Sequence, residues 1–186
     1  MYKDWIKLEN DCKLCLKCRL AEKRNNVVFG VGNTKSKVLF VGEGPGENDD
    51  LQGEPFVGRA GRLLDEMLNE FGFSRKKNIY IANIVKCRPP NNRDPLPEEQ
   101  EKCIFWLREQ FKLICPSIVV CLGRIAAAKM IKPDIKITKE HGTFFKKGSL
   151  IFMPTLHPAA ILRNPSMKNE AISDFSKLKS YYEKIL

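Results

Sequence analysis

The sequence lacks the features of a membrane or exported protein. No apolar run approaches the roughly 20 residues that a membrane-spanning helix needs. The first residues, from Met1 to Trp5, lack the apolar stretch of a signal peptide. The chain also has no linker, internal repeat or low-complexity segment, so we expect residues 1–186 to form one domain. A cytoplasmic protein is therefore predicted.

Histidine is scarce, with only His141 and His157 in the chain. His157 follows the apolar run Leu150–Met153 in a loop bounded by prolines, and we predict a functional role for it. His141 has no such setting and is predicted to be an ordinary surface residue.

The seven cysteines are an odd number, and in a reducing compartment this argues against a disulfide framework. Cys12, Cys15 and Cys18 form two overlapping C-x2-C pairs, a spacing that brings two thiolates to one metal or cluster. No further C-x2-C pair follows to complete a zinc site. Cys115 and Cys121 flank an apolar run and are predicted to be buried thiols.

The remaining cysteines complete the predicted thiolate site. The economical choice is a four-thiolate site of Cys15, Cys18, Cys87 and Cys103. From spacing alone, Cys12 could replace Cys15, and both zinc and a [4Fe–4S] cluster fit four thiolates.

The charge is strongly positive. Thirty-two Lys and Arg against 22 Asp and Glu give a formal net charge of +10. This balance favours a polyanionic partner, since each neutralised phosphate releases counterions. The alternative is a basic surface with no binding role.

Apolar runs alternate with helical patterns and predict the α/β class. Strands are expected at 38–41, 79–85, 117–122 and 150–153, with a hairpin within 134–148. Helices are expected at about 1–11, 59–72, 98–114, 124–130 and 168–186. This order predicts one parallel sheet with helices on both faces.

A glycine-rich loop follows the first strand. It contains Gly42-Glu43-Gly44-Pro45-Gly46 and continues to Phe56, the one aromatic residue among small and polar ones. Asn83 lies near the end of the second strand. Ligands of open α/β sheets bind at the carboxyl ends of strands, so these residues are candidates for a binding site.

Four motifs in this order resemble the family 4 uracil-DNA glycosylases, the iron–sulfur type of thermophilic archaea and bacteria. They are Gly42-Glu43-Gly44-Pro45-Gly46, Gly53-Glu54-Pro55-Phe56-Val57-Gly58, Asn83-Ile84-Val85-Lys86-Cys87-Arg88-Pro89-Pro90 with Asn92-Arg93, and His157-Pro158. The resemblance implies a three-layer α/β/α fold with a four-stranded parallel sheet. It also implies a structural [4Fe–4S] cluster on Cys15, Cys18, Cys87 and Cys103, because Cys18-Arg19-Leu20 fits the family pattern.

The resemblance also implies a repair reaction that flips uracil out of DNA and hydrolyses its N-glycosidic bond. The implied catalytic residues are His157, Glu43 and Gly44. Uracil would be bound by Glu43, Gly44, Asp49, Phe56, Asn83 and His157. DNA would be contacted by Arg59, Arg88, Arg93, Ile161, Leu162 and Arg163, with simple packing as the alternative for Ile161 and Leu162.

Several points stay open at the level of sequence. The general base is not identified among Glu43, Glu47 and Asp49, and rejection of thymine is undecided. The expected partner is uracil-containing DNA, single- or double-stranded, bound by a nucleoid-associated monomer, with a sliding clamp as a candidate protein partner. The alternatives are another base excision activity, a binding module without catalysis, and a nucleotide-dependent Rossmann enzyme, which the absence of G-x-G-x-x-G disfavours.

Overall fold

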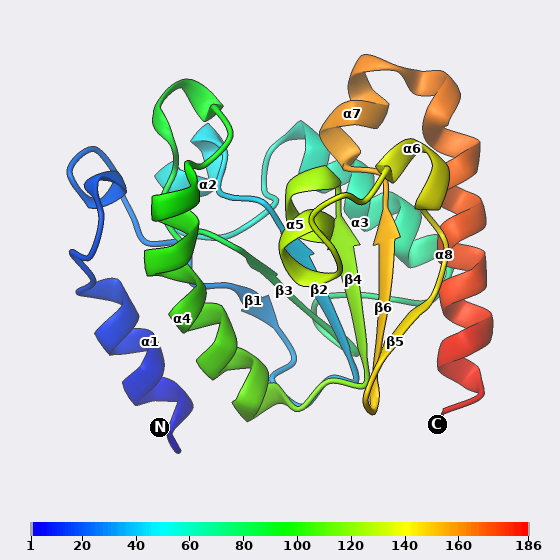
Figure 1. Ribbon diagram of the computed structural model, residues 1–186, viewed down its shortest axis with the longest axis horizontal. Helices are drawn as coiled ribbons and strands as arrows, with labels where there is room; N and C mark the ends of the chain where they lie inside the picture. Colours follow the sequence, from blue (N-terminus) through cyan, green and yellow to red (C-terminus); the bar gives the residue numbers. More distant parts are fainter. Residues whose placement is uncertain (1, 186) are drawn as a thin grey trace.

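The computed structural model describes residues 2–185, in which strands and helices alternate (Figure 1). The strands are β1 (Val31–Gly32), β2 (Val38–Gly42), β3 (Ile79–Asn83), β4 (Ile118–Leu122), β5 (Phe145–Lys147) and β6 (Leu150–Thr155). The α-helices are α1 (Trp5–Lys13), α2 (Glu47–Gln52), α3 (Arg59–Glu70), α4 (Pro97–Ile114), α5 (Arg124–Met130), α6 (Ile137–Glu140), α7 (Pro158–Arg163) and α8 (Lys168–Glu183). Short 3-10 helices lie at Arg19–Ala21, Pro90–Asn92 and Pro165–Met167.

The six strands form one sheet in the order β1-β3-β2-β4-β6-β5. The four inner strands run parallel, as predicted. The prediction of a four-stranded sheet was incomplete, because β1 and β5 add antiparallel edges. These edge strands are two and three residues long, too short for a recognisable alternation pattern. The hairpin predicted within 134–148 lies later in the chain: β5 pairs with β6 around a turn that contains Gly148, and residues 137–140 form α6.

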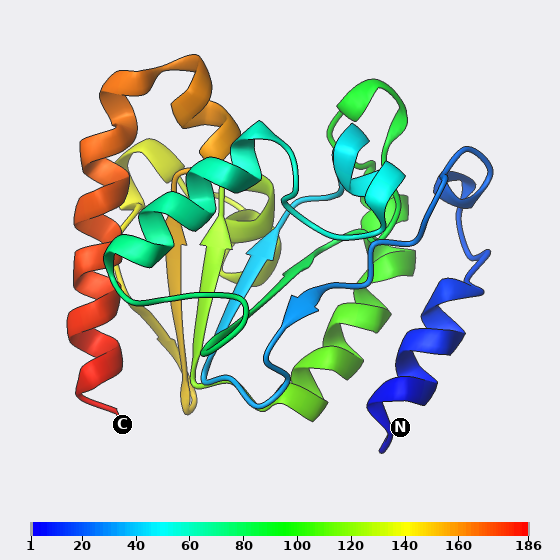
Figure 2. The same ribbon diagram turned by 180° about the vertical axis from the view of Figure 1, so that it is seen from behind.

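Both faces of the sheet are covered by helices. In β2, Leu39 and Val41 pack in a core with residues of α1, α4 and α5. Val38 and Phe40 point to the other face and pack with residues of α3 and α8. Figure 1 shows the first set of helices in front of the sheet, and Figure 2 shows the second set. Burial on both faces explains why β2 is a continuous apolar run, and it confirms the three-layer arrangement.

The order of the inner strands creates a crevice at the end of the sheet where their carboxyl ends lie. From β2 the chain crosses to β3 on one side, and from β3 it crosses back to β4 on the other side of β2. The loops after β2 and β4 therefore leave in opposite directions, and ligands of such sheets bind between them. The glycine-rich loop after β2 lies at this point.

Helix α2 was not predicted, because its six residues have no apolar stripe. It is anchored instead by Asp50, which is 1% exposed. The Asp50 carboxylate accepts hydrogen bonds from the backbone N–H groups of Asn25 and Asn26 at 3.0 and 3.2 Å. The anchor holds the start of the Gly46–Phe56 segment against the N-terminal part of the chain.

Between residues 2 and 185, no helix is both long and apolar enough to cross a membrane.

Candidate active site

Three strand ends converge on one cleft. Glu43 and Gly44 follow β2, Gly123 follows β4, and His157 lies two residues beyond β6. These residues and Phe56 line a cleft of about 790 Å³. Of the residues predicted to bind uracil, the cleft brings together Glu43, Gly44, Asp49, Phe56 and His157, whereas Asn83 is not among the residues that line it.

Asn83, the last residue of β3, carries a buried side-chain amide without a partner. It is 1% exposed, and within the described chain neither Oδ1 nor Nδ2 has a hydrogen-bond partner. A Cβ on Gly42 would lie 2.3 Å from Asn83 Oδ1 and 2.7 Å from the Phe56 ring, so only glycine allows the two groups to come together there. An unsatisfied buried amide costs roughly 1–3 kcal/mol. Such a group is suited to a ligand that supplies the missing partners.

Phe56 lies between Asn83 and His157. Its ring centroid is 5.7 Å from that of His157, with 36° between the planes. Phe56 is 6% exposed, and its backbone has φ +56°, an uncommon value for a residue other than glycine. The Phe56 ring and the Asn83 amide therefore both lie against the backbone of Gly42, and the same ring lies beside His157.

His157 is a neutral hydrogen-bond donor at neutral pH. Burial, with a smaller effect from Arg163, lowers the pKa of His157 to about 4. The His157 Nδ1 atom accepts a hydrogen bond from the Ala159 backbone N–H at 3.2 Å, which caps α7. Nδ1 is therefore unprotonated, and the ring carries its proton on Nε2.

Glu43 is the carboxylate best suited to proton transfer. Its pKa is raised to about 7, mainly by burial and also by nearby Asp94, while Arg124 opposes the increase. Arg124 and Asp94 are themselves paired at 2.7 Å. Neither was predicted as a site residue, although Arg124 follows a strand end just as Glu43 does.

The other two candidate carboxylates have partners. Asp49 Oδ1 accepts from Val57 N at 2.9 Å, and Oδ2 accepts from Gly46 N at 3.2 Å. Glu47 is largely exposed and lies 3.4 Å from Arg88. Asp49 therefore braces the loop around Phe56, which leaves Glu43 as the available carboxylate of the three.

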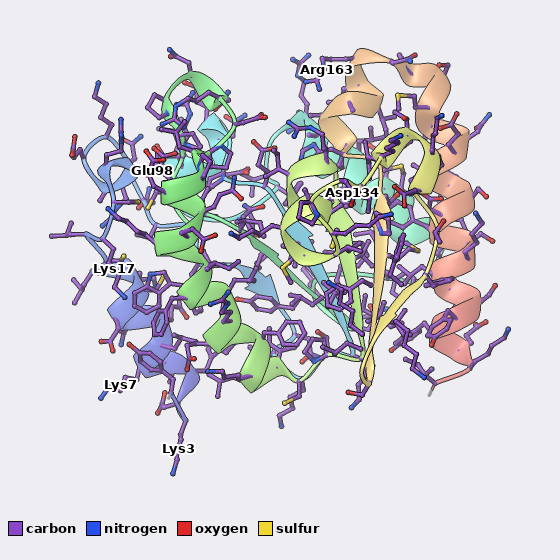
Figure 3. The ribbon with its side chains drawn as sticks, viewed as in Figure 1. Lys3, Lys7, Lys17, Glu98, Asp134 and Arg163 are labelled. Atoms are coloured by element: carbon purple, nitrogen blue, oxygen red, sulfur yellow. The ribbon has the colours of Figure 1, made fainter. Side chains whose placement is uncertain are left out.

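The predicted DNA-contacting residues lie in three settings: the cleft, the core, and the loop between β3 and α4. Arg59, Leu162 and Arg163 are exposed and line the cleft. Figure 3 shows Arg163 at the end of the molecule where α7 lies. Ile161, by contrast, is 2% exposed and packs in the core. Its predicted insertion into a DNA groove does not fit this position, and packing is its role here.

Arg88 and Arg93 have partners nearby in the sequence or in the glycine-rich loop, and Arg93 also lines the cleft. Arg93 forms a two-pronged pair with the buried carboxylate of Glu99, at 2.7 and 2.8 Å. Arg88 donates to Asn92 at 2.8 Å and lies beside Glu47. Both residues therefore shape the loop between β3 and α4.

Five cysteines gather at the side of the sheet covered by α1 and α4. Cys12, Cys15, Cys18, Cys87 and Cys103 line one pocket. Within residues 2–185, no three His, Cys, Asp or Glu side chains form a group that could hold a single metal ion. Cys121 is buried as predicted, whereas Cys115 is exposed because it caps the end of α4 with φ +50°.

Three of these thiols accept N–H hydrogen bonds. Trp106 Nε1 donates to Cys15 Sγ at 3.3 Å and Arg24 Nη1 to Cys87 Sγ at 3.4 Å. The backbone N–H of Lys86 donates to Cys103 Sγ at 3.2 Å. Hydrogen bonds to sulfur favour thiolates, the form that binds iron or zinc. The donor set of the pocket therefore fits a thiolate-bound group.

His141 is paired with a buried carboxylate, which was not predicted. Its Nδ1 lies 2.9 Å from the carboxylate of Asp174, which is fully buried and also accepts from Thr155 Oγ1 at 2.7 Å. The prediction of an ordinary surface residue was wrong, because α8 brings Asp174 to a loop more than 30 residues earlier in the chain.

Together, the fold and the cleft define an α/β/α protein with a recognition site where the parallel strands end. The chain matches the model of the uracil DNA glycosylase superfamily over residues 29–177. It is 47% identical over 174 residues to the type-4 uracil-DNA glycosylase of Archaeoglobus fulgidus, covering 88% of this chain and 86% of the relative. It is 45% identical over 176 residues to that of Thermotoga maritima, covering 92% and 91%. The chain belongs to the uracil DNA glycosylase superfamily, and the resemblance to its type-4 members is confirmed.

Proposed function

We propose that this chain is a monofunctional uracil-DNA glycosylase of base excision repair. It flips uracil out of DNA and hydrolyses the N-glycosidic bond, which releases free uracil and leaves an abasic site in the DNA. The observation that carries the proposal is the unpartnered amide of Asn83, buried beside Phe56 at the end of β3. The names of the relatives support it.

Recognition of uracil is assigned to Asn83. An amide offers one acceptor oxygen and an NH2 donor. It accepts from N3–H of uracil and donates to O4, whereas cytosine presents the reversed pattern. With cytosine, polar groups would be buried unpaired at a cost of roughly 1–3 kcal/mol.

The flipped base stacks on the Phe56 ring while Asn83 reads its edge, and base–aromatic stacking is worth roughly 1–3 kcal/mol. Extrahelical uracil is the form of the base that can enter such a pocket.

His157 and Glu43 divide the chemistry. The neutral Nε2–H of His157 donates to O2 of the leaving uracil as negative charge develops there, and one such donor is typically worth about 100-fold in rate. Glu43, with a pKa of about 7, accepts a proton from the water that attacks C1′. The Gly44 backbone borders the same cleft without a side chain to obstruct the base.

The thiol pocket is assigned to a structural [4Fe–4S] cluster on Cys15, Cys18, Cys87 and Cys103. Such a cluster spreads its thiolates over four irons, so a single-ion geometry is not required. It would crosslink separate segments and takes no part in the glycosylase step. This cluster also agrees with a thermophilic source for the chain, since family 4 uracil-DNA glycosylases are the iron–sulfur type of thermophilic archaea and bacteria.

Binding is assigned to Arg59, Arg163 and Leu162 around the cleft, on single- or double-stranded DNA. We infer that residues 1–186 act as one domain and as a monomer at the nucleoid in the cytoplasm. A sliding clamp stays a predicted partner.

The test is release of free uracil from a labelled oligonucleotide that carries one deoxyuridine. A thymine-containing oligonucleotide and the Asn83→Ala variant are run beside it. Uracil release that depends on Asn83 is expected. Absence of release by protein with its cluster loaded would overturn the proposal.

A further inference from the structure

Arg75 holds the backbone of the Phe56 turn from a distant part of the chain. It lies between α3 and β3, and its side chain is 12% exposed. Its Nη1 donates to the Pro55 carbonyl at 2.5 Å and its Nη2 to the Phe56 carbonyl at 2.6 Å. Its Nε donates to Asp65 at 2.8 Å, which fixes the guanidinium on α3. One planar group thus binds two successive carbonyls and a carboxylate.

The Phe56 turn needs such support. Its φ of +56° lies in a region that residues with a Cβ rarely adopt. The Phe56 carbonyl also passes so close to α3 that a Cβ on Gly61 would lie 1.7 Å from it. On the other side of the turn, Asp49 binds the Val57 N–H. The peptide groups around Phe56 are therefore held from both sides.

We propose that Arg75 is a positioning residue for uracil recognition, acting through Phe56. Arg75 keeps the Phe56 backbone in its left-handed conformation, and this fixes where the Phe56 ring lies relative to a base bound by Asn83. The proposal rests on the proposed function, since it takes uracil as the base that Phe56 contacts. Nothing in the sequence marks Arg75, because it lies outside the strand ends and glycine loop that form the site.

The fork of the guanidinium explains why arginine is required. A lysine keeps the charge but presents one point donor on a flexible stem, so it cannot bind both carbonyls and Asp65 together. Arg75→Lys should therefore behave like Arg75→Gln. If Arg75 contributed only charge, the lysine variant would retain full function.

The experiment compares binding to two oligonucleotides that the enzyme does not cleave. One carries 2′-fluoro-2′-deoxyuridine, which presents uracil, and the other carries an abasic-site analogue, which presents the same backbone without a base. We expect Arg75→Gln and Arg75→Lys to weaken binding of the first by about tenfold or more, as for a displaced positioning group, and to leave the second unchanged. Arg62→Gln, an exposed arginine on α3, is the control and should alter neither.

Two further variants test the route through Phe56. Gly61→Ala should push the Phe56 carbonyl away and reproduce the selective loss with Arg75 intact. In a Phe56→Ala background, Arg75→Gln should add little, because the ring that Arg75 positions is gone although the backbone carbonyls remain.

Equal losses on both oligonucleotides, or full additivity with Phe56→Ala, would overturn the positioning role. Melting temperature is measured for each variant, and a fall in melting temperature without selective loss of uracil binding would mean a purely structural role. If the unmodified enzyme releases uracil and Arg75→Gln binds both oligonucleotides normally, the inference alone falls. If the unmodified enzyme releases no uracil, the proposed function falls.

Discussion

Two buried polar side chains near the end of the sheet have opposite surroundings. Asp174 is fully buried and has Thr155 and His141 as hydrogen-bond partners. Asn83 is equally buried and, within the described chain, has none. Most buried polar groups in proteins are satisfied, so the unsatisfied one identifies where a ligand belongs. Asp174 joins α8 to the end of β6, whereas the Asn83 amide is left without a partner for a ligand to satisfy.

The Asn83 amide should therefore contribute to uracil release while adding little to the free energy of unfolding. We expect Asn83→Ala to lose about 100-fold or more in uracil release, as removal of a key polar group at a reaction centre typically does. Its free energy of unfolding should stay within about 1 kcal/mol of the parent value, because relief of the unpaired amide offsets lost packing. Urea denaturation and the uracil-release assay measure the two effects. A large destabilisation would mean that Asn83 is satisfied in the free protein.

The pH dependence of activity should follow Glu43 and be unaffected by His157 above about pH 5. The Glu43 carboxyl has a pKa of about 7, so its proton-accepting form is lost as pH falls below 7. His157 has a pKa of about 4 and stays neutral throughout this range. We expect kcat/KM to rise through pH 7 to a plateau, and Glu43→Gln to remove that rise. A rise that persists in the Glu43→Gln variant would assign it to another group.

At the scale of elements, the thiol pocket brings together cysteines from three separate segments of the chain. Cys15 and Cys18 follow α1, Cys87 follows β3, and Cys103 lies in α4. Helix α1 packs on α4, at the edge of the molecule (Figure 1). A group bound to all four thiols would therefore hold the N-terminal segment to the rest of the domain.

Loss of one thiolate should release that segment. We expect Cys103→Ser to lose visible absorption and iron, and to expose the chain before Val27 to limited proteolysis. Cys115→Ser is the matched control, because Cys115 is exposed and lies outside the pocket. Zinc in place of iron in the purified protein would contradict the cluster assignment, and unchanged proteolysis would contradict its structural role.

Over the whole molecule, the positive charge is not confined to the cleft. Figure 3 shows Lys3, Lys7 and Lys17 on the side of α1, far from Arg163. A net charge of +10 favours DNA binding in general, and under the proposed function the arginines that line the cleft are the ones expected to meet phosphates flanking a flipped base.

The salt dependence of DNA affinity should distinguish the arginines of the cleft from the lysines on the side of α1. Removing one phosphate contact lowers the slope of log affinity against log salt by about 1. We expect Arg163→Gln to produce that change for a deoxyuridine oligonucleotide, and Lys3→Gln to leave the slope unaltered. Fluorescence anisotropy over about 50–200 mM salt measures it. Equal slopes for Arg163→Gln and the parent protein would remove Arg163 from the DNA interface.

Much of the fold was predictable because its signals are local. The apolar runs of the four inner strands, the proline at the start of α4 and Gly123 before α5 each determine structure within a few residues. The edge strands and α2 were missed because their short sequences carry no periodicity, and they form only against neighbours.

For the site, the order of residues along the chain specifies which residues follow each strand, and the parallel topology brings Glu43, Asn83 and His157 to the same end of the sheet. Their protonation and hydrogen bonding depend on the tertiary structure. Burial sets the pKa values of His157 and Glu43, and packing leaves Asn83 unpaired and Ile161 in the core. It also brought Arg75 to Phe56 and Asp174 to His141. Such contacts depend on how distant helices dock on the sheet, and no local pattern in the chain records them.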